Sequence, residues 1–422
     1  MMGDALHPLG PLTGCRVLEL GSTVAGPFCG RLMADFGAEV IKVEPPGGDP
    51  VRSMGKHFEG KSLYATSIFR NKKLISVDLN TTEGQDIIRK ILPNFDIVIE
   101  NFRPGALERW GLGYNDLKAL NPALIMVRIS GFGQDGPYRE RPGYGFLGDA
   151  VSSFLSINGY PDRPPVRAAV PVTDMLTALY GAYGAALALL VREKTGRGQF
   201  IDAALYESAF SLMESHVPAF DKLKAAPKRS GSRLAGSTPN NLYKTCDDEL
   251  VAIVAASDSV FKRLASAMGQ PELTSDRRFA TALARTNHED EIDLLISKWS
   301  GNRSLDEILI TLHKADVPAS RVFTIEDVFE DPHYHARNII ARVPSEELGV
   351  VAMVAPVPKL SETPGRIRWA GGRVGQDTRA VLTELGRLSP AEISNLERSR
   401  AIFCEDHAAG SVRPATAAAI GS

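Results

Sequence analysis

The sequence contains one carboxylate whose position could support covalent chemistry. Asp174 lies in residues 168–175 (AAVPVTDM), an extended run that ends where a long apolar segment begins. A helix start favours an ionised carboxylate, because the helix dipole and the free N–H groups there stabilise negative charge. A nucleophilic attack requires the same ionised form. The local pattern alone favours a simpler interpretation, in which Asp174 is the N-cap of a helix.

Several basic and histidine side chains could bind ligands. Arg103 offers a planar fork that suits a phosphate, or it caps a strand end. Arg109, in the run GALERWG, is by its local pattern a solvated helix residue. His333 and His335 could ligate a metal, but two histidines in one loop without further clustered ligands are more often structural. The sequence therefore predicts no metal site.

The glycines after the first predicted strand invite comparison with a dinucleotide site. Residues 21–27 (GSTVAGP) do not form the GxGxxG fingerprint, and a proline stands where the helix begins. Glu44, at the end of the second strand, would be the ribose ligand of such a site. Without the fingerprint it is better explained as a strand-end carboxylate. What remains is a helix start lined by Gly and Ala, which can accept a phosphate or another anionic group.

An α/β framework must position these residues. The first half alternates strands and helices with spacers that suit right-handed crossovers, which predicts a largely parallel sheet. Pro27 begins one helix and Gly37 ends it. Thr82 and Gln85 give a capping-box signature for a helix that reaches Leu92. The expected strands are 16–20 (RVLEL), 39–44 (EVIKVE), 74–79 (LISVDL), 96–100 and 124–129.

A change of composition divides the chain. Residues 223–236 (LKAAPKRSGSRLAG) read as a linker or a mobile loop. Beyond them, a hairpin at 241–255 and amphipathic helices at 289–299 and 305–314 indicate a smaller α+β domain. The expected organisation is 1–221 as the first part of a large α/β domain, 222–329 as the small domain, 330–406 as a return to the large domain, and 407–422 as a disordered tail.

Composition excludes some classes of partner. The 422 residues are 44% hydrophobic, enough for a sizeable core, and 48 Lys and Arg nearly balance 50 Asp and Glu. A net charge of -2 gives no reason to expect nucleic acid or an anionic membrane as a partner. The four cysteines are scattered, which fits a reducing cytosol and predicts a cytoplasmic protein.

One segment requires a membrane check. Residues 175–191 (MLTALYGAYGAALALLV) carry no charge. They are rich in Ala and Gly and at the short limit for a membrane span, so we interpret them as a buried core helix. Residues 1–12 lack a basic stretch followed by an apolar one, and no secretory signal is expected.

Several segments, in order over nearly the whole chain, resemble those of a family III CoA-transferase of the formyl-CoA transferase type. Each segment alone is a weak signal, and their order and spacing carry the resemblance. They are 14–20 (GCRVLEL) with 25–27 (AGP), 37–45 (GAEVIKVEP), 48–52 (GDPVR), 71–73 (NKK) with 77–79 (VDL), 100–109 (ENFRPGALER), 129–133 (ISGFG), 194–199 (KTGRGQ) and 331–333 (DPH).

The resemblance implies a fold and a reaction. The fold is a Rossmann-like large domain with a smaller domain, in two chains threaded through each other as an interlocked homodimer. The family's nucleophilic aspartate corresponds to Asp174. Its attack on an acyl-CoA thioester would give an acyl-aspartyl anhydride and then an aspartyl-CoA thioester, from which a free carboxylic acid takes the CoA. CoA is the co-substrate, with no tightly bound cofactor, metal or ATP, and family habit suggests a dicarboxylate such as succinate.

The resemblance also implies CoA contacts. Arg109 matches a family arginine that contacts CoA, and Val24 and Ala25 match a turn that approaches it, where small side chains allow close contact. The expected CoA-binding residues are Val24, Ala25, Val77, Asp78, Leu79, Asn80, Asn101, Phe102, Arg103, Arg109, Arg141, Pro142, Gly143 and Tyr144.

Departures from the family pattern bear on the substrate. Formyl-specific members carry Gln in place of Val24 and Arg in place of Pro45, which argues against formate or oxalate. Their glycine run over the active site corresponds only to residues 231–238 (GSRLAGST), so whether this segment acts as a lid stays open. The related α-methylacyl-CoA racemases use a His where this chain has Tyr144, which is a poor base at neutral pH. A racemase-like isomerase and a non-catalytic CoA-binding protein remain as alternatives.

Overall fold

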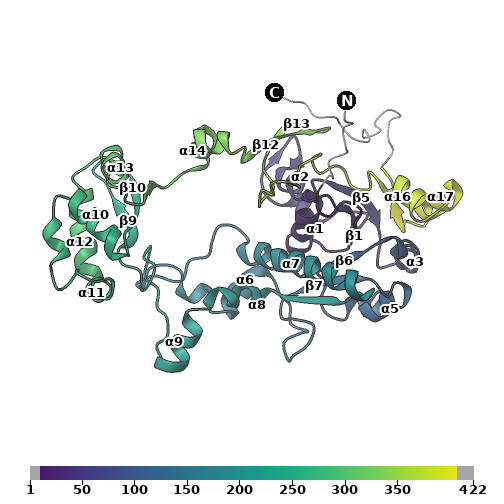
Figure 1. Ribbon diagram of the computed structural model, residues 1–422. Helices are drawn as coiled ribbons and strands as arrows, with labels where there is room; N and C mark the ends of the chain where they lie inside the picture. Colours follow the sequence, from purple (N-terminus) through teal and green to yellow (C-terminus); the bar gives the residue numbers. More distant parts are fainter. Residues whose placement is uncertain (1–9, 406–422) are drawn as a thin grey trace. The chain divides into compact units, whose positions relative to one another are not determined.

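The structure is a computed structural model that describes residues 10–405. Its internal contacts divide the chain into two compact units (Figure 1). Unit 1 comprises residues 10–152, 168–214 and 338–405, and unit 2 comprises residues 153–167 and 215–337. The domain boundaries expected from the sequence stay predictions, and the expected tail at 407–422 lies outside the described residues.

Unit 1 is built on a seven-stranded sheet in the order β14-β5-β2-β1-β6-β7-β8. All neighbouring pairs are parallel except β14 and β5. The prediction of an α/β fold with a largely parallel sheet is therefore confirmed. Two strands, β8 and β14, were not predicted. The strands are β1 (Arg16–Glu19), β2 (Glu39–Glu44), β5 (Lys72–Val77), β6 (Ile97–Glu100), β7 (Ile125–Ser130), β8 (Phe200–Ala204) and β14 (Ile402–Phe403).

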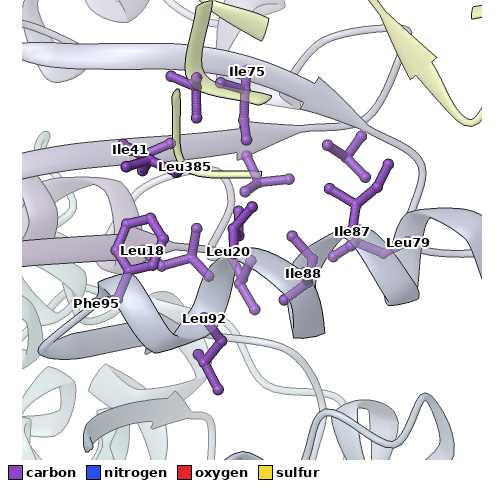
Figure 2. Packing of buried hydrophobic residues seen from close by; sticks show 14 of the residues in the cluster. Leu18, Leu20, Ile41, Ile75, Leu79, Ile87, Ile88, Leu92, Phe95 and Leu385 are labelled. Atoms are coloured by element: carbon purple, nitrogen blue, oxygen red, sulfur yellow. The ribbon is translucent and has the colours of Figure 1, made fainter. Parts of the chain in front are cut away.

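Helices cover both faces of this sheet. On one face, α3 and the C-terminal helices pack on the strands around Leu18, Ile41 and Ile75, where Figure 2 shows Ile87 and Ile88 of α3 against them. On the other face, α1 and α7 pack on β1, β6 and β7. The helices of unit 1 are α1 (Ala25–Asp35), α2 (Leu63–Ile68), α3 (Thr82–Ile91), α4 (Ala106–Arg109), α5 (Tyr114–Leu120), α6 (Gly145–Val151), α7 (Val172–Thr195), α8 (Leu205–Phe210), α16 (Thr378–Glu384) and α17 (Pro390–Arg398). Two short antiparallel hairpins complete it, β3–β4 (His57–Phe58, Lys61–Ser62) and β12–β13 (Ile340–Ser345, Gly349–Val354).

Helix starts differ slightly from the prediction. Thr81, and not Thr82, caps α3, because its hydroxyl accepts the N–H of Gly84 while its backbone is extended. Pro27 is the third residue of α1, still within the turn whose N–H groups have no helical acceptor. Gly37 follows the end of α1 with a φ of +103°, as the prediction of a terminating glycine requires.

Residues close to the C-terminus complete the outer edge of β5. Asp377 Oδ2 accepts the N–H of Leu74 at 2.7 Å, and Thr378 Oγ1 accepts the N–H of Ser76 at 2.9 Å. β14 pairs with the end of β5 next to them. The edge strand β5 therefore has its backbone groups satisfied by residues about 300 positions later in the chain.

The prediction of a buried core helix at 175–191 is correct for only one face of α7. Small residues on that face pack on the sheet and on α1, where a side chain at Gly181 would meet Val127 and Cys29. The opposite face exposes large apolar side chains, and 28% of the most apolar window of α7 is buried. By length and composition alone α7 could cross a membrane. The exposed apolar residues are Leu179, Tyr180, Tyr183, Leu187, Leu190 and Val191.

Unit 2 combines a three-stranded antiparallel sheet with helices around a core of its own. The predicted hairpin is present as β9 and β10, and the predicted helix at 305–314 matches α13. The elements are α9 (His216–Leu223), β9 (Asn240–Lys244), β10 (Leu250–Val254), α10 (Asp258–Ala267), α11 (Ala282–Asn287), α12 (Glu289–Ser300), α13 (Leu305–Lys314), β11 (Ala319–Arg321), α14 (Ile325–Glu330) and α15 (Pro332–Ala336).

Candidate active site

Four of the predicted segments meet at one edge of the unit 1 sheet. Residues 24–25, 101–109 and 141–144 follow the carboxyl ends of β1, β6 and β7, and residues 77–80 begin at the last residue of β5. These strands are parallel, so their carboxyl ends lie at the same edge. Ligands of open α/β sheets bind at this edge.

The turn between β1 and α1 has a constrained backbone. Thr23 has a φ of +67°, a left-handed conformation that residues other than glycine rarely adopt. Asp49 Oδ1 accepts the N–H of Thr23 at 3.0 Å, and the buried Lys42 ammonium donates to the Gly21 carbonyl and pairs with Asp49 at 2.9 Å. These bonds fix the turn to β2, which carries Lys42, and to Asp49 in the segment after β2.

The predicted contact residues of this turn are buried. Val24 is the N-cap residue of α1 and caps it with no side-chain hydrogen bond, and Ala25 is the first residue of the helix. Both side chains are in the interior of unit 1. A ligand at this turn would therefore meet its backbone and the start of α1 rather than these two side chains.

Asn101 connects the turn to the segment after β6. Its Oδ1 accepts the N–H of Ser22 at 2.7 Å, and its Nδ2 donates to the Ser22 carbonyl at 2.9 Å. A Cβ at Gly21 would stand 2.9 Å from Asn101 Oδ1, and a Cβ at Gly26 would stand 2.9 Å from the Gly21 Cα. The amide of Asn101, predicted to contact CoA, thus joins two of the predicted segments through both its oxygen and its nitrogen.

The rest of the 101–109 segment presents cations at the surface. Arg103 and Arg109 are exposed, and Phe102 packs edge-on against Trp110 with ring centroids 5.3 Å apart. Gly105 is the N-cap residue of α4 with a φ of +85°, and a Cβ there would stand 3.5 Å from Arg109 Nη1. The two arginines are available for the phosphates of a nucleotide-like ligand.

The segment after β5 divides into buried and exposed side chains. Val77 and Leu79 belong to the core, whereas Asn80 is exposed. Asp78 Oδ1 accepts hydrogen bonds from the Asn80 backbone N–H at 2.9 Å and from its side chain at 3.0 Å. Only Asp78 and Asn80 can therefore offer polar side chains to a ligand.

The segment after β7 ends at Tyr144, one residue before the glycine that contacts Asp174. Arg141, Pro142 and Tyr144 are exposed, with the Arg141 guanidinium 3.5 Å from the centre of the Tyr138 ring. Gly143 packs against the backbone of Gly131, where neither position has room for a side chain.

Gly145, the first residue of α6, lies against the carboxylate of Asp174. A Cβ on Gly145 would stand 1.9 Å from Asp174 Oδ2. Asp174 is half-buried in the first turn of α7, and Pro171 is the N-cap residue of that helix. The interpretation of Asp174 as the N-cap is therefore wrong. The carboxylate instead occupies a position that exists because residue 145 has no side chain.

Sequence reasoning missed Tyr64, which lies near Asp174, and Arg31, which lies near Tyr64. Burial, together with the negative charge of Asp174, raises the pKa of the Tyr64 phenol, and the Tyr64 hydroxyl has no hydrogen-bond partner among the described residues. Arg31 on α1 is close enough to act in the opposite direction on the same phenol. No local pattern marks either residue, since they lie more than a hundred positions before Asp174.

The positive charge of Arg31 is only weakly balanced by a neighbouring carboxylate. Burial lowers its pKa to about 10, and its Nε has no hydrogen-bond partner among the described residues. The nearest carboxylate, Asp35, is 3.8 Å away and already binds Arg70 through both oxygens and Asn71 through one. The Arg31 guanidinium stacks on Phe28 at 4.1 Å. A buried cation of this kind is a candidate for binding an anionic group.

Other features lie apart from Asp174. A surface hollow of about 490 Å³ in unit 2, between α10 and α13, and one of about 220 Å³ near Gly14 are lined by none of the predicted residues. Among residues 10–405, no group of three His, Cys, Asp or Glu side chains could hold a metal. In unit 2, Arg233 fastens the possible lid at 231–238 to Asp293 of α12, with Nε and Oδ2 2.6 Å apart.

Comparisons with known proteins are consistent over almost the whole chain. A family model described as CoA-transferase family III matches residues 12–378. The chain is 46% identical to the succinyl-CoA–D-citramalate CoA-transferase of Chloroflexus aurantiacus, over 94% of this chain and 99% of the relative. It is 40% identical to the beta subunit of the succinyl-CoA–L-malate CoA-transferase of the same organism, over 93% and 98% of the two chains. The crystal structure of a CAIB/BAIF family protein from Brucella suis superposes with a TM-score of 0.79 at 33% identity, covering 89% of this chain and 99% of that one.

Proposed function

The chain belongs to CoA-transferase family III and is an enzyme that transfers CoA, and we propose that Asp174 is its nucleophile and succinyl-CoA its CoA donor. The observation that carries the proposal is the contact between the Asp174 carboxylate and Gly145, at the sheet edge where the predicted CoA segments meet. The donor is inferred from relatives whose names specify succinyl-CoA.

The proposed reaction balances without a metal or ATP. An Asp174 oxygen attacks the thioester carbonyl and expels CoA thiolate, which leaves an acyl-aspartyl anhydride. The thiolate attacks Asp174 Cγ, releases succinate and forms an aspartyl-CoA thioester. The acceptor carboxylate then attacks Cγ, giving a new anhydride and thiolate. Attack of the thiolate on the acceptor's carbonyl yields the new acyl-CoA and restores the Asp174 carboxylate.

Tyr64 is the proposed hydrogen-bond donor beside these intermediates. Its buried hydroxyl has no partner among the described residues and lies within the electrostatic influence of Asp174. A buried donor without an acceptor is costly unless a ligand supplies one. A carbonyl oxygen that becomes an oxyanion during attack would be such an acceptor.

Arg31 supports a dicarboxylic acid as substrate. Its Nε lacks an acceptor, and Asp35 compensates its charge only weakly. One carboxylate of a dicarboxylic acid would react at Asp174. The other, which does not react, would pair with the Arg31 guanidinium. D-citramalate and L-malate, named in the relatives, are acids with two carboxylates.

A second copy of the chain is the proposed partner of α7. The helix exposes a row of large apolar side chains along one face, from Leu179 to Val191. Such a row is unfavourable in water and typical of a permanent interface. Covering it with the same face of a second copy would make a homodimer, in agreement with the interlocked dimer that the family resemblance implied.

Mass spectrometry of the intact protein and of its proteolytic peptides tests the nucleophile. After mixing with succinyl-CoA, wild type should carry a CoA-sized adduct on the peptide that contains Asp174, and hydroxylamine should remove it. Asp174→Asn should lack the adduct and lose turnover by at least about a thousandfold. Asp86→Asn, which changes an exposed aspartate on α3, is the control. Full turnover by Asp174→Asn, or exchange of an α-proton with deuterated water without CoA transfer, would contradict the proposal.

A comparison of acceptors tests the role of Arg31. Wild type and Arg31→Gln are assayed with succinyl-CoA as donor and with either malate or butyrate as acceptor. Arg31→Gln should raise KM for malate about tenfold or more and leave KM for butyrate nearly unchanged. Equal effects on both acceptors would exclude Arg31 as the site of the second carboxylate.

A further inference from the structure

Arg128 bridges the two ends of the 101–109 segment. Its Nε is 2.8 Å from Glu100 Oε1, and its Nη1 is 2.8 Å from Glu108 Oε1. The other oxygen of Glu100, Oε2, accepts the N–H of Phe102 at 2.8 Å. One guanidinium thus connects the residue before the segment with α4 near its end.

The sheet register makes this bridge possible. Glu100 is the last residue of β6 and stands opposite Arg128 of the parallel strand β7. The side chains are 1% and 9% exposed respectively, whereas Glu108 is 45% exposed. Arg128 therefore extends from the buried edge of the sheet to the surface, where α4 presents Glu108 and the neighbouring Arg109.

The chemistry of the three side chains suits a rigid connection. A planar guanidinium can satisfy two carboxylates in fixed directions, which a lysine ammonium cannot do in the same way. Burial works against ionisation of Glu108, but the hydrogen bond from Arg128 holds the pKa of Glu108 below its ordinary value. Without Arg128, Glu100 would be a buried carboxylate that has lost its ion-pair partner.

We propose that Arg128 is a positioning residue that sets the shape of the 101–109 segment for CoA, by holding Glu100 and Glu108 at a fixed separation. The inference rests on the proposed function, because it takes Arg103 and Arg109 of this segment as the CoA contacts. Arg128 itself does not touch the reacting atoms. Its effect passes through the backbone at Phe102 and through α4, which carries Arg109.

Direct measurement of CoA binding tests the proposal. Isothermal titration of CoA into wild type, Arg128→Met and Arg128→Lys should give a Kd about tenfold weaker for Met. Lys should restore less than half of the loss in binding, because it keeps the charge but not the fork. Steady-state assays should show the same rise in KM for acyl-CoA, with kcat and KM for the acid nearly unchanged.

A second variant protects the test against misfolding. Glu108→Gln removes only the exposed end of the bridge, so it should fold like wild type and still weaken CoA binding several-fold. If Arg128 acts through Glu108, the double variant should bind CoA no worse than Arg128→Met alone. Arg379→Met breaks an exposed ion pair with Glu397 in the same unit and should leave the Kd unchanged.

The outcomes separate this inference from the proposed function. Wild-type Kd values in both Arg128→Met and Glu108→Gln would overturn the positioning role, whatever the activity. So would a loss of thermal stability without a change in Kd. A wild-type chain that binds CoA but forms no adduct at Asp174 would overturn the nucleophile and leave the role of Arg128 to be judged from the Kd values.

Discussion

Gly145 and Asp174 are in such close contact that a single methyl group on the glycine would stand 1.9 Å from the carboxylate oxygen. The glycine thus fixes the place of the proposed nucleophile. The neighbouring Asp174 backbone belongs to α7, whose packing on the sheet leaves little freedom to move away.

Gly145→Ala should therefore displace the carboxylate and reduce kcat by about a hundredfold, since a displacement of about 1 Å at a reacting group has effects of this size. The CoA-adduct yield at Asp174 should fall in parallel. Gly47→Ala is the matched control, because a Cβ there meets nothing within 4 Å. Wild-type kcat in Gly145→Ala would show that the position of the carboxylate does not matter for the reaction.

Asn101→Ala should weaken CoA binding by about tenfold, because it removes both hydrogen bonds that hold the turn at Ser22. Titration with CoA measures the effect. Asn121→Ala is a suitable control, since Asn121 makes comparable bonds to the Phe95 carbonyl before β6 and to the Ala123 N–H before β7. That control should lower thermal stability without weakening CoA binding, and equal Kd changes in both variants would indicate a general loss of structure.

Glu100 should make the stability of the protein depend on pH. Burial raises its pKa to about 7 from an ordinary value of 4.5. The folded chain therefore keeps a proton that the unfolded chain releases, and stability should fall as pH rises from about 4.5 to about 7, by roughly 3 kcal/mol. Glu100→Gln lacks this titration. The difference in unfolding free energy between the two proteins, measured by urea denaturation, should change across this pH range, and parallel curves would contradict the assignment.

Leu187→Glu should weaken self-association at least tenfold, because it places a charge in the exposed apolar row of α7. Analytical ultracentrifugation over a range of concentrations measures the change. Leu294→Glu alters a similarly exposed leucine on α12 and serves as control. A wild-type chain that stays monomeric at micromolar concentration would disprove the proposed homodimer.

The sequence predicted the parts of the fold that local pattern determines. β1 (RVLE) and β2 (EVIKVE) carry short runs of Val, Ile and Leu that mark them as strands, and the parallel sheet follows from their spacing. β8 was missed because Asp202 interrupts its apolar pattern and Phe200 is exposed. The two residues of β14 are too few for any periodicity to be visible.

In the candidate site too, the sequence predicted local segments but not the contacts between residues far apart in the chain. Motif order located the sheet-edge segments, including Asn101 and Arg109, but could not show that the Asn101 amide bonds to Ser22. Tyr64 comes near Asp174, and Arg31 near Tyr64, only through the packing of α1 and α2 in unit 1, which no spacing in the sequence encodes. Both faces of α7 are apolar, so the sequence could not tell that the face with small residues packs on the sheet while the face with large side chains is exposed.

The dependence of β5 on Asp377, Thr378 and β14 has a consequence for synthesis. While the ribosome is still translating the middle of the gene, the emerged strand has an open edge that can pair with neighbouring nascent chains. Unit 1 can reach its finished state only after Asp377, Thr378 and β14 have been synthesised. Chaperones that shield the nascent chain should therefore raise the yield of this protein.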